Sequence, residues 1–125
     1  MQLHNLDHMT IRCRPQDLPA IEQFYGQVLG LKAGRRPDFD FPGIWFYLGD
    51  RPVVHIAARL HELPESKGTY DHVSFKASGI AQTRARLDSM GVPYGEAPVP
   101  GFPLHQIFLT DPTGAKVELT FDQPA

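Results

Sequence analysis

Two pairs of short segments in the chain resemble each other, and this internal repeat constrains the fold more than any other feature. Residues 6–11 (LDHMTI) resemble residues 70–75 (YDHVSF), with an Asp-His pair at the same place in each. Residues 54–56 (VHI) resemble residues 117–119 (VEL), and a loop deletion of one residue brings both matches into line. A repeat indicates two structural units of one kind. We therefore expect both halves of the chain to fold in the same way.

Hydrophobic periodicity predicts the same order of elements in both halves, which is a strand, a helix and three further strands. In the first half we expect a strand at 3–14, a helix at 17–29, a strand within 31–41, and strands at 44–49 and 53–58. In the second half we expect a strand at 70–77, then a helix capped by Ser78 and closed by Gly91, and a short strand at 92–94. A Pro- and Gly-rich loop at 95–103 should follow. The last two strands are expected at 104–110 and 117–121, joined by a turn at 111–114. The polar segment 59–69 is typical of a linker. We expect one domain over residues 1–125, with module 1 at about 3–60 and module 2 at about 69–123.

Composition narrows the range of partners. The formal net charge is −2, which argues against binding to nucleic acid or to an anionic membrane. The chain has no apolar run long enough to span a membrane, and no signal-peptide pattern opens it, so we expect a cytoplasmic protein. The single cysteine, Cys13, cannot form an internal disulfide and is typical of a small core residue.

Four metal-capable side chains occupy matching places in the two halves. In each half, the first and last strands carry one such residue on the face that alternation directs away from the core: His8 and His55 in the first half, His72 and Glu118 in the second. Two similar units that pair about a pseudo-two-fold axis would bring all four to one cleft. Imidazole and carboxylate ligands suit one divalent ion, namely Zn²⁺, Fe²⁺, Mn²⁺, Co²⁺ or Ni²⁺. His55 is alternatively a general base or a neutral hydrogen-bonding group.

At this point the sequence resembles the vicinal oxygen chelate superfamily, which contains glyoxalase I, extradiol dioxygenases, fosfomycin-modifying enzymes and bleomycin-binding proteins. The resemblance covers almost the whole chain and is carried by LDH at 6–8, FY at 24–25 with VLGL at 28–31, DHV at 71–73, QIFLTDPTG at 106–114 and VEL at 117–119. It implies an α+β fold in which two βαβββ modules form a cupped, incomplete mixed β-barrel around a metal. It also implies a homodimer.

Metal-binding members of this superfamily commonly take one ligand from the first strand of each module and a Glu from the last strand. His8, His72 and Glu118 occupy those places here. The remaining place is Glu in typical glyoxalase I, whereas this chain has His55, which departs from a strict glyoxalase I pattern. The resemblance further implies that Glu118 is the catalytic base, with His55 as the alternative base.

We expect the strand faces that point away from the core to line a partly aromatic substrate cleft. The candidate substrate-binding residues are Arg12, which could hold an anionic substrate, together with Trp45, Tyr47, Gln106 and Phe108. Aromatic side chains in the flanking loops, Phe39, Phe41 and Phe102, could add to the cleft or pack as a lid.

Three functions remain open. The first is a glyoxalase-like lyase or isomerase that acts on a small, vicinally oxygenated substrate chelated to the metal. The second is a non-haem Fe²⁺ extradiol-type ring-cleaving dioxygenase, because two His and one carboxylate are the ligands of such iron sites. The third is a bleomycin-resistance-type protein that sequesters a ligand without turnover.

Overall fold

The structure is a computed structural model that describes residues 1–2, 4–65 and 70–123. By contacts within the chain, it divides into two compact units, Met1–Pro64 and Glu65–Ala125. The boundary falls within the predicted linker 59–69, of which residues 66–69 lie outside the described part. That the two units act as one domain stays a prediction.

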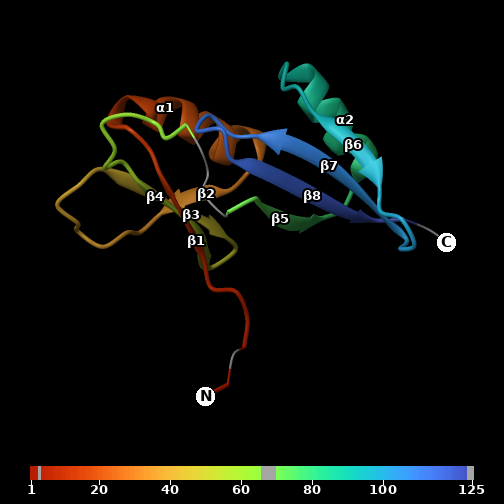
Figure 1. Cartoon of the computed structure of the whole chain (residues 1–125), viewed down its shortest axis with the longest axis horizontal. Helices are drawn as coiled ribbons and strands as arrows, with labels where there is room; N and C mark the ends of the chain where they lie inside the picture. Colours follow the sequence, from red (N-terminus) through yellow and green to blue (C-terminus); the bar gives the residue numbers. More distant parts are fainter. Residues whose placement is uncertain (3, 66–69, 124–125) are drawn as a thin grey trace. The chain divides into compact units, whose positions relative to one another are not determined.

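The first unit is a four-stranded mixed sheet with a helical segment after its first strand (Figure 1). The elements are β1 (Met9–Arg12), η1 (Pro15–Asp17), α1 (Leu18–Ile21), η2 (Glu22–Val28), β2 (Lys32–Gly34), β3 (Gly43–Leu48) and β4 (Arg51–Ala57). The strand order is β1-β4-β3-β2. β1 runs parallel to β4, and the other neighbours are antiparallel.

The second unit repeats this topology. Its elements are β5 (His72–Ala77), α2 (Ile80–Ser89), β6 (Gly95–Pro98), β7 (Leu104–Thr110) and β8 (Lys116–Asp122). The strand order is β5-β8-β7-β6, with β5 parallel to β8 and the other pairs antiparallel. The structure therefore confirms that each half is a βαβββ module.

Each core forms where apolar residues alternate with polar ones. In the first unit, Cys13 and Phe46 are fully buried, as expected of core positions. In the second unit, Ile107, Val117 and Phe121 are buried on the apolar face of β7 and β8. The other face of each sheet therefore carries the polar side chains, which is the face that the sequence assigns to the site.

The predicted helix at 17–29 is helical throughout but is not a regular α-helix. A 3₁₀ turn (η1) leads into the short α1, and η2 continues as a π-helix in which the Leu29 N–H donates to the Phe24 carbonyl oxygen at 3.0 Å. In the second unit, α2 begins at Ile80 after Gly79, so the predicted cap at Ser78 is wrong.

The expectation for residues 92–103 is also wrong. The strand is not at 92–94 but at Gly95–Pro98, within the predicted loop, where β6 pairs with β7. Pro98 lacks a backbone N–H, but β6 is an edge strand, and an edge strand tolerates a missing donor. The turn at 111–114 is confirmed, because Asp111 Oδ1 accepts the N–H groups of Thr113 and Ala115, and Gly114 has a φ of 90°.

Candidate metal and substrate site

Glu118 and His72 face each other across the parallel pair β5 and β8. His72 Nε2 lies 3.4 Å from Glu118 Oε2, and Glu118 is only 6% exposed. The Gln106 side-chain amide donates to the same carboxylate oxygen at 3.0 Å. Lys116 Nζ lies 3.6 Å from the other oxygen. A buried carboxylate is thus surrounded by donors from β7 and β8, which offset the loss of water around its charge.

Both histidines of the repeat are held by the acid that precedes them. His8 Nδ1 donates to Asp7 Oδ1 at 2.8 Å, and His72 Nδ1 donates to Asp71 Oδ1 at 2.9 Å. A carboxylate can only accept, so Nδ1 of each ring carries a proton and Nε2 points to the other side of the ring. This arrangement resembles the way in which metal-bound histidines are oriented, with the second ring nitrogen bonded to a carboxylate.

His55 lies in a stack of three rings. Its ring centroid is 3.9 Å from that of His8 and 3.8 Å from that of Trp45, with interplanar angles of 14° and 10°. His55 Nε2 donates to the Pro52 carbonyl oxygen at 2.9 Å. Burial, together with the nearby His8 ring, holds the pKa of His55 below its usual value, which favours the neutral form of the ring.

This stack does not suit ligation of one ion by both His8 and His55. The lone pair of an imidazole nitrogen lies in the plane of its ring, whereas these two planes are nearly parallel and are separated by the stacking distance. That His55 is a fourth ligand stays a prediction. The third role considered for His55, a neutral hydrogen-bonding group, agrees with its bond to the Pro52 carbonyl oxygen.

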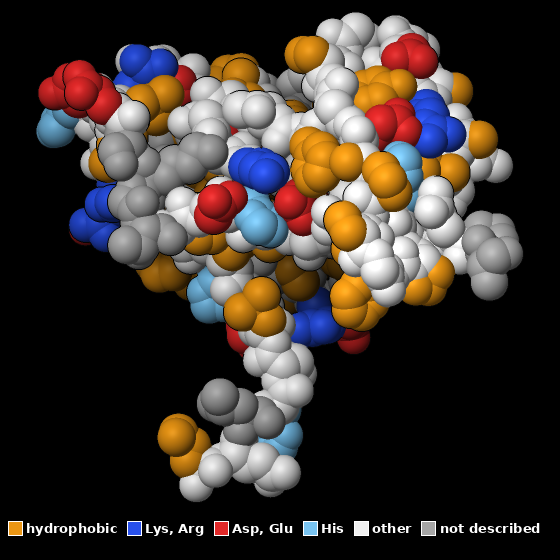
Figure 2. Space-filling model, turned by 45° about the vertical axis from the view of Figure 1, so that its right-hand side comes forward, with side chains coloured by type: hydrophobic (Ala, Val, Ile, Leu, Met, Phe, Trp, Pro, Cys, Tyr) orange, Lys and Arg blue, Asp and Glu red, His pale blue; other side chains and the backbone are white. Residues whose placement is uncertain are grey.

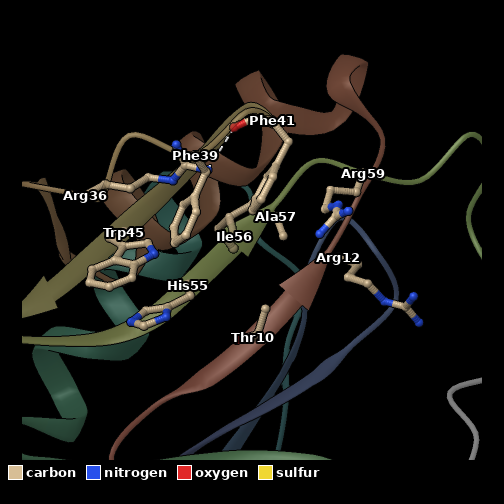
Figure 3. A pocket seen from close by; sticks show the side chains of 10 residues that line it. All are labelled: Thr10, Arg12, Arg36, Phe39, Phe41, Trp45, His55, Ile56, Ala57 and Arg59. Carbon is tan, nitrogen blue, oxygen red and sulfur yellow. Dashed lines mark hydrogen bonds between the residues drawn. The ribbon is translucent and has the colours of Figure 1, made fainter.

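A pocket of about 310 Å³ opens beside this stack (Figure 3). Its walls include Thr10 and Arg12 from β1, Trp45 from β3 and His55 from β4. The loop between β2 and β3 contributes the aromatic residues Phe39 and Phe41, which stack on each other with ring centroids 5.0 Å apart. The pocket thus joins the ring stack of the candidate metal site to a space that a small molecule could fill.

The predicted substrate-binding residues lie in three places. Arg12 and Trp45 line the pocket. Tyr47 does not, because its ring packs across Gly34 and its hydroxyl donates to the Arg35 carbonyl oxygen at 2.5 Å. Gln106 holds Glu118 through its side-chain amide. The Phe108 ring lies under Lys116 Nζ, at 5.0 Å, on the strand next to Glu118.

Two arginines that line the pocket were not predicted from the sequence as site residues. Arg36 lies in the loop after β2, and Arg59 lies in what reads as the start of the linker. Neither position shows a periodicity that marks it as facing a site. The signal that could have found them is the density of aromatic residues at 39–45, because guanidinium groups often stack on such rings.

The pairs His8–His55 and His72–Glu118 belong to different units of the chain. Among residues 1–2, 4–65 and 70–123, no group of three or more His, Cys, Asp or Glu side chains lies close enough together to hold an ion. That all four predicted ligands meet at one ion therefore stays a prediction.

Clusters of acidic, basic and histidine side chains also appear on the surface (Figure 2). In the second unit, Glu96 of β6 accepts from Arg84 of α2 at 2.6 Å and from His105 of β7 at 2.8 Å. Hydrogen bonds from Arg84 and His105 hold the pKa of Glu96 below its usual value. These hydrogen bonds link α2 to the edge of its sheet.

With the fold and these contacts established, comparison with known proteins assigns the family. The model of the Glyoxalase/Bleomycin resistance protein/Dioxygenase superfamily matches residues 5–119, so the chain belongs to this superfamily, which includes enzymes. No curated protein sequence matches the chain. No helix in the described part of the chain is long and apolar enough to cross a membrane.

Solved structures share the fold at low sequence identity. A putative glyoxalase family protein from Bacillus anthracis superposes with a TM-score of 0.81 at 19% identity, covering 98% of each chain. A glyoxalase/dioxygenase from Nostoc punctiforme has a TM-score of 0.75 at 17% identity, covering 96% of this chain and 92% of its own. The fosfomycin resistance protein FosX from Listeria monocytogenes has a TM-score of 0.73 at 18% identity, and the match covers 98% of this chain and 96% of the FosX chain. The predicted α+β fold of two βαβββ modules is confirmed.

Proposed function

We propose that this protein is a glyoxalase-like, metal-dependent lyase or isomerase that acts on a small, vicinally oxygenated substrate. The observation that carries the proposal is the pair His72 Nε2 and Glu118 Oε2, two lone-pair donors 3.4 Å apart. Side-chain nitrogen and carboxylate oxygen atoms are the ligands that such divalent ions accept, and the closeness of this pair supports a shared ion.

The same reasoning selects the third ligand. His8 has the same bond from Nδ1 to a preceding aspartate as His72, which turns its Nε2 to the other side of the ring. We therefore assign His8, His72 and Glu118 as ligands of one divalent ion, which is Zn²⁺, Fe²⁺, Mn²⁺, Ni²⁺ or Co²⁺. His55 serves as the neutral ring that positions His8 by stacking.

Held by His8, His72 and Glu118, such an ion would supply Lewis-acid stabilisation of the negative charge that forms on the substrate oxygens. Glu118 takes a proton from the substrate carbon next to the chelated oxygens, on whichever carboxylate oxygen is free, and in an isomerase returns it to the adjacent carbon. Gln106 holds the other end of the carboxylate in place.

Ring cleavage by a non-haem Fe²⁺ dioxygenase is the second candidate. The flat walls made by Trp45, His55 and Phe39 favour it, because they suit an aromatic substrate such as a catechol. Both candidates use the same three ligands. In either case we propose a cytoplasmic homodimer.

Metal content and activity test the proposal together. Protein purified without an affinity tag and loaded with divalent ions should hold about one ion per chain by elemental analysis. Glu118→Gln should lose the ion and at least about 100-fold in rate, whereas His55→Gln should keep the ion. Loss of an added hemithioacetal without oxygen consumption supports the lyase or isomerase. Oxygen consumption with a catechol supports the dioxygenase. Wild-type protein that takes up no divalent ion contradicts both.

A further inference from the structure

The pocket beside the ring stack carries a strong positive charge. Arg12, Arg36 and Arg59 all contribute to its walls, and none of the lining residues is acidic. In the part of the chain that the structure describes, none of the three arginines forms an ion pair with a carboxylate. Three guanidinium groups around so small a space repel one another unless an anion lies between them.

The sheet topology explains why two of these arginines meet. Arg12 is the last residue of β1 and pairs with Ala57, the last residue of β4, and the two strands are parallel. Arg59 follows two residues later, just past the end of β4. The carboxyl ends of both strands therefore bring Arg12 and Arg59 to one edge of the sheet. The Arg59 guanidinium lies over the Phe41 ring, 4.6 Å from its centroid.

Arg36 has one donor left unused. Its terminal nitrogen donates to the Phe41 carbonyl oxygen at 2.9 Å, and its guanidinium lies 4.9 Å from the Phe39 ring centroid. Its Nε is buried and has no hydrogen-bond partner within the described residues. A buried donor without an acceptor is unfavourable, and an acceptor atom on a bound molecule would relieve it.

The remaining wall of the pocket is flat and apolar. Trp45 and His55 are stacked face to face, and Phe39 lies beside Trp45 at a centroid distance of 6.4 Å. Figure 3 shows Arg12 and Arg59 at one end of the pocket, and Trp45, His55 and Phe39 at the other, with Arg36 beside Phe39. Two arginines thus lie at one end of the pocket, and the aromatic rings lie with the third arginine at the other.

We propose that this pocket binds a planar small molecule that carries a carboxylate or a phosphate group. The anionic group lies between Arg12 and Arg59, and the planar part lies against Trp45 and Phe39. Arginine forks bind both kinds of oxyanion through two parallel hydrogen bonds. The inference rests on the proposed function in that it names the substrate class of the same site, since His55 contacts both the pocket and His8.

The only tryptophan of the chain lies in this pocket, so its fluorescence reports binding directly. Metal-free protein, prepared with a chelator, is titrated with benzoate, phenyl phosphate and the neutral benzamide, with excitation of Trp45. We expect saturable quenching by benzoate or phenyl phosphate at least about 10-fold tighter than by benzamide. The tighter of the two anions identifies the preferred anionic group.

Two charge-removing variants separate the pocket from general electrostatics. Arg59→Gln should weaken anion binding about 10-fold or more, and Arg59→Lys should restore part of it. Arg35→Gln removes the same charge from the same unit outside the pocket and should bind like wild type. Circular dichroism checks that each variant is folded.

The inference is overturned if benzamide binds as tightly as both anions, or if Arg59→Gln and Arg35→Gln bind them equally well. Because the assay uses metal-free protein, its result is independent of the metal chemistry. Failed anion binding in protein that takes up a divalent ion refutes the inference alone. Anion binding in protein that takes up no divalent ion refutes the proposed metal-dependent function alone.

Discussion

At the scale of single residues, the contact between Arg14 and Asp17 shows how one ion pair connects two elements. Asp17 is buried, and it accepts three hydrogen bonds from Arg14: from the backbone N–H at 2.9 Å, from Nε at 3.0 Å and from a terminal nitrogen at 2.7 Å. Arg14 is the N-cap residue of η1, two residues after β1 ends, so these bonds fix the first turn of the helical segment that follows β1. The side-chain hydrogen bonds from Arg14 hold the pKa of Asp17 below its usual value.

Replacing this carboxylate should reduce stability. Asp17→Asn is expected to lower the free energy of unfolding by about 1 to 2 kcal/mol at pH 7, because buried donors lose a charged acceptor. Asp122→Asn, at an exposed carboxylate paired with Lys76, should change it by less than about 0.5 kcal/mol. Urea denaturation measures both values, and equal effects would contradict the argument.

The same carboxylate makes stability depend on pH. Because the pKa of Asp17 is lower in the folded chain than in the unfolded chain, its contribution is complete above the unfolded value. It is lost as the pH falls through the folded value. The difference in stability between wild type and Asp17→Asn should therefore shrink as the pH is lowered into that acidic range.

At the scale of elements, the pairing of β3 with β4 depends on a glycine. A Cβ atom at Gly43 would collide with the Ile56 carbonyl oxygen and would lie 2.8 Å from an Arg36 terminal nitrogen. The first contact is with backbone, which cannot move aside without disturbing the sheet. The second is with a pocket arginine, so the close approach of β3 and β4 also sets where Arg36 lies.

Gly43→Ala should therefore disturb both the sheet and the pocket. We expect a loss of about 2 to 4 kcal/mol in the free energy of unfolding and weaker quenching of Trp45 by benzoate. Gly26→Ala is the matched control, because its Cβ would meet Phe46 at an ordinary 3.7 Å. That control should be neutral or slightly stabilising, since alanine favours helix over glycine. A Gly43→Ala protein as stable as wild type would contradict so close an approach of the two strands.

At the scale of the whole molecule, the repeat gives each unit one Asp-His pair and one further candidate group. His72 and Glu118 are already in place within the second unit. His8 belongs to the first unit, where it stacks on His55. The proposed function requires both units to supply ligands to the same ion.

This requirement predicts that single changes in either unit remove the same ion. His8→Ala and His72→Ala should each abolish stoichiometric uptake of the divalent ion, measured by elemental analysis after dialysis. His61→Ala, at an exposed histidine without a counterpart in the repeat, should retain it. If His8→Ala keeps a full complement of metal while His72→Ala loses it, the ion belongs to the second unit alone.

Much of the fold was predictable because the local pattern is strong. Alternation at 117–121 placed Val117 and Phe121 in the core and Glu118 on the opposite face, and the structure agrees. The strand at Gly95–Pro98 was not predictable, because its residues have low strand propensity. This strand forms because it pairs with β7, and its own residues contain no local pattern that predicts this pairing.

The sequence alone determined the two βαβββ modules, their cores and the face on which the candidate ligands lie, because these follow from periodicity and from an internal repeat. Only the tertiary structure decided that His55 stacks between His8 and Trp45, that Tyr47 turns toward Arg35, and that arginines far apart in the chain share one pocket. The physical reason is that periodicity specifies the face of a strand, whereas ring stacking and charge clustering depend on which strands become neighbours.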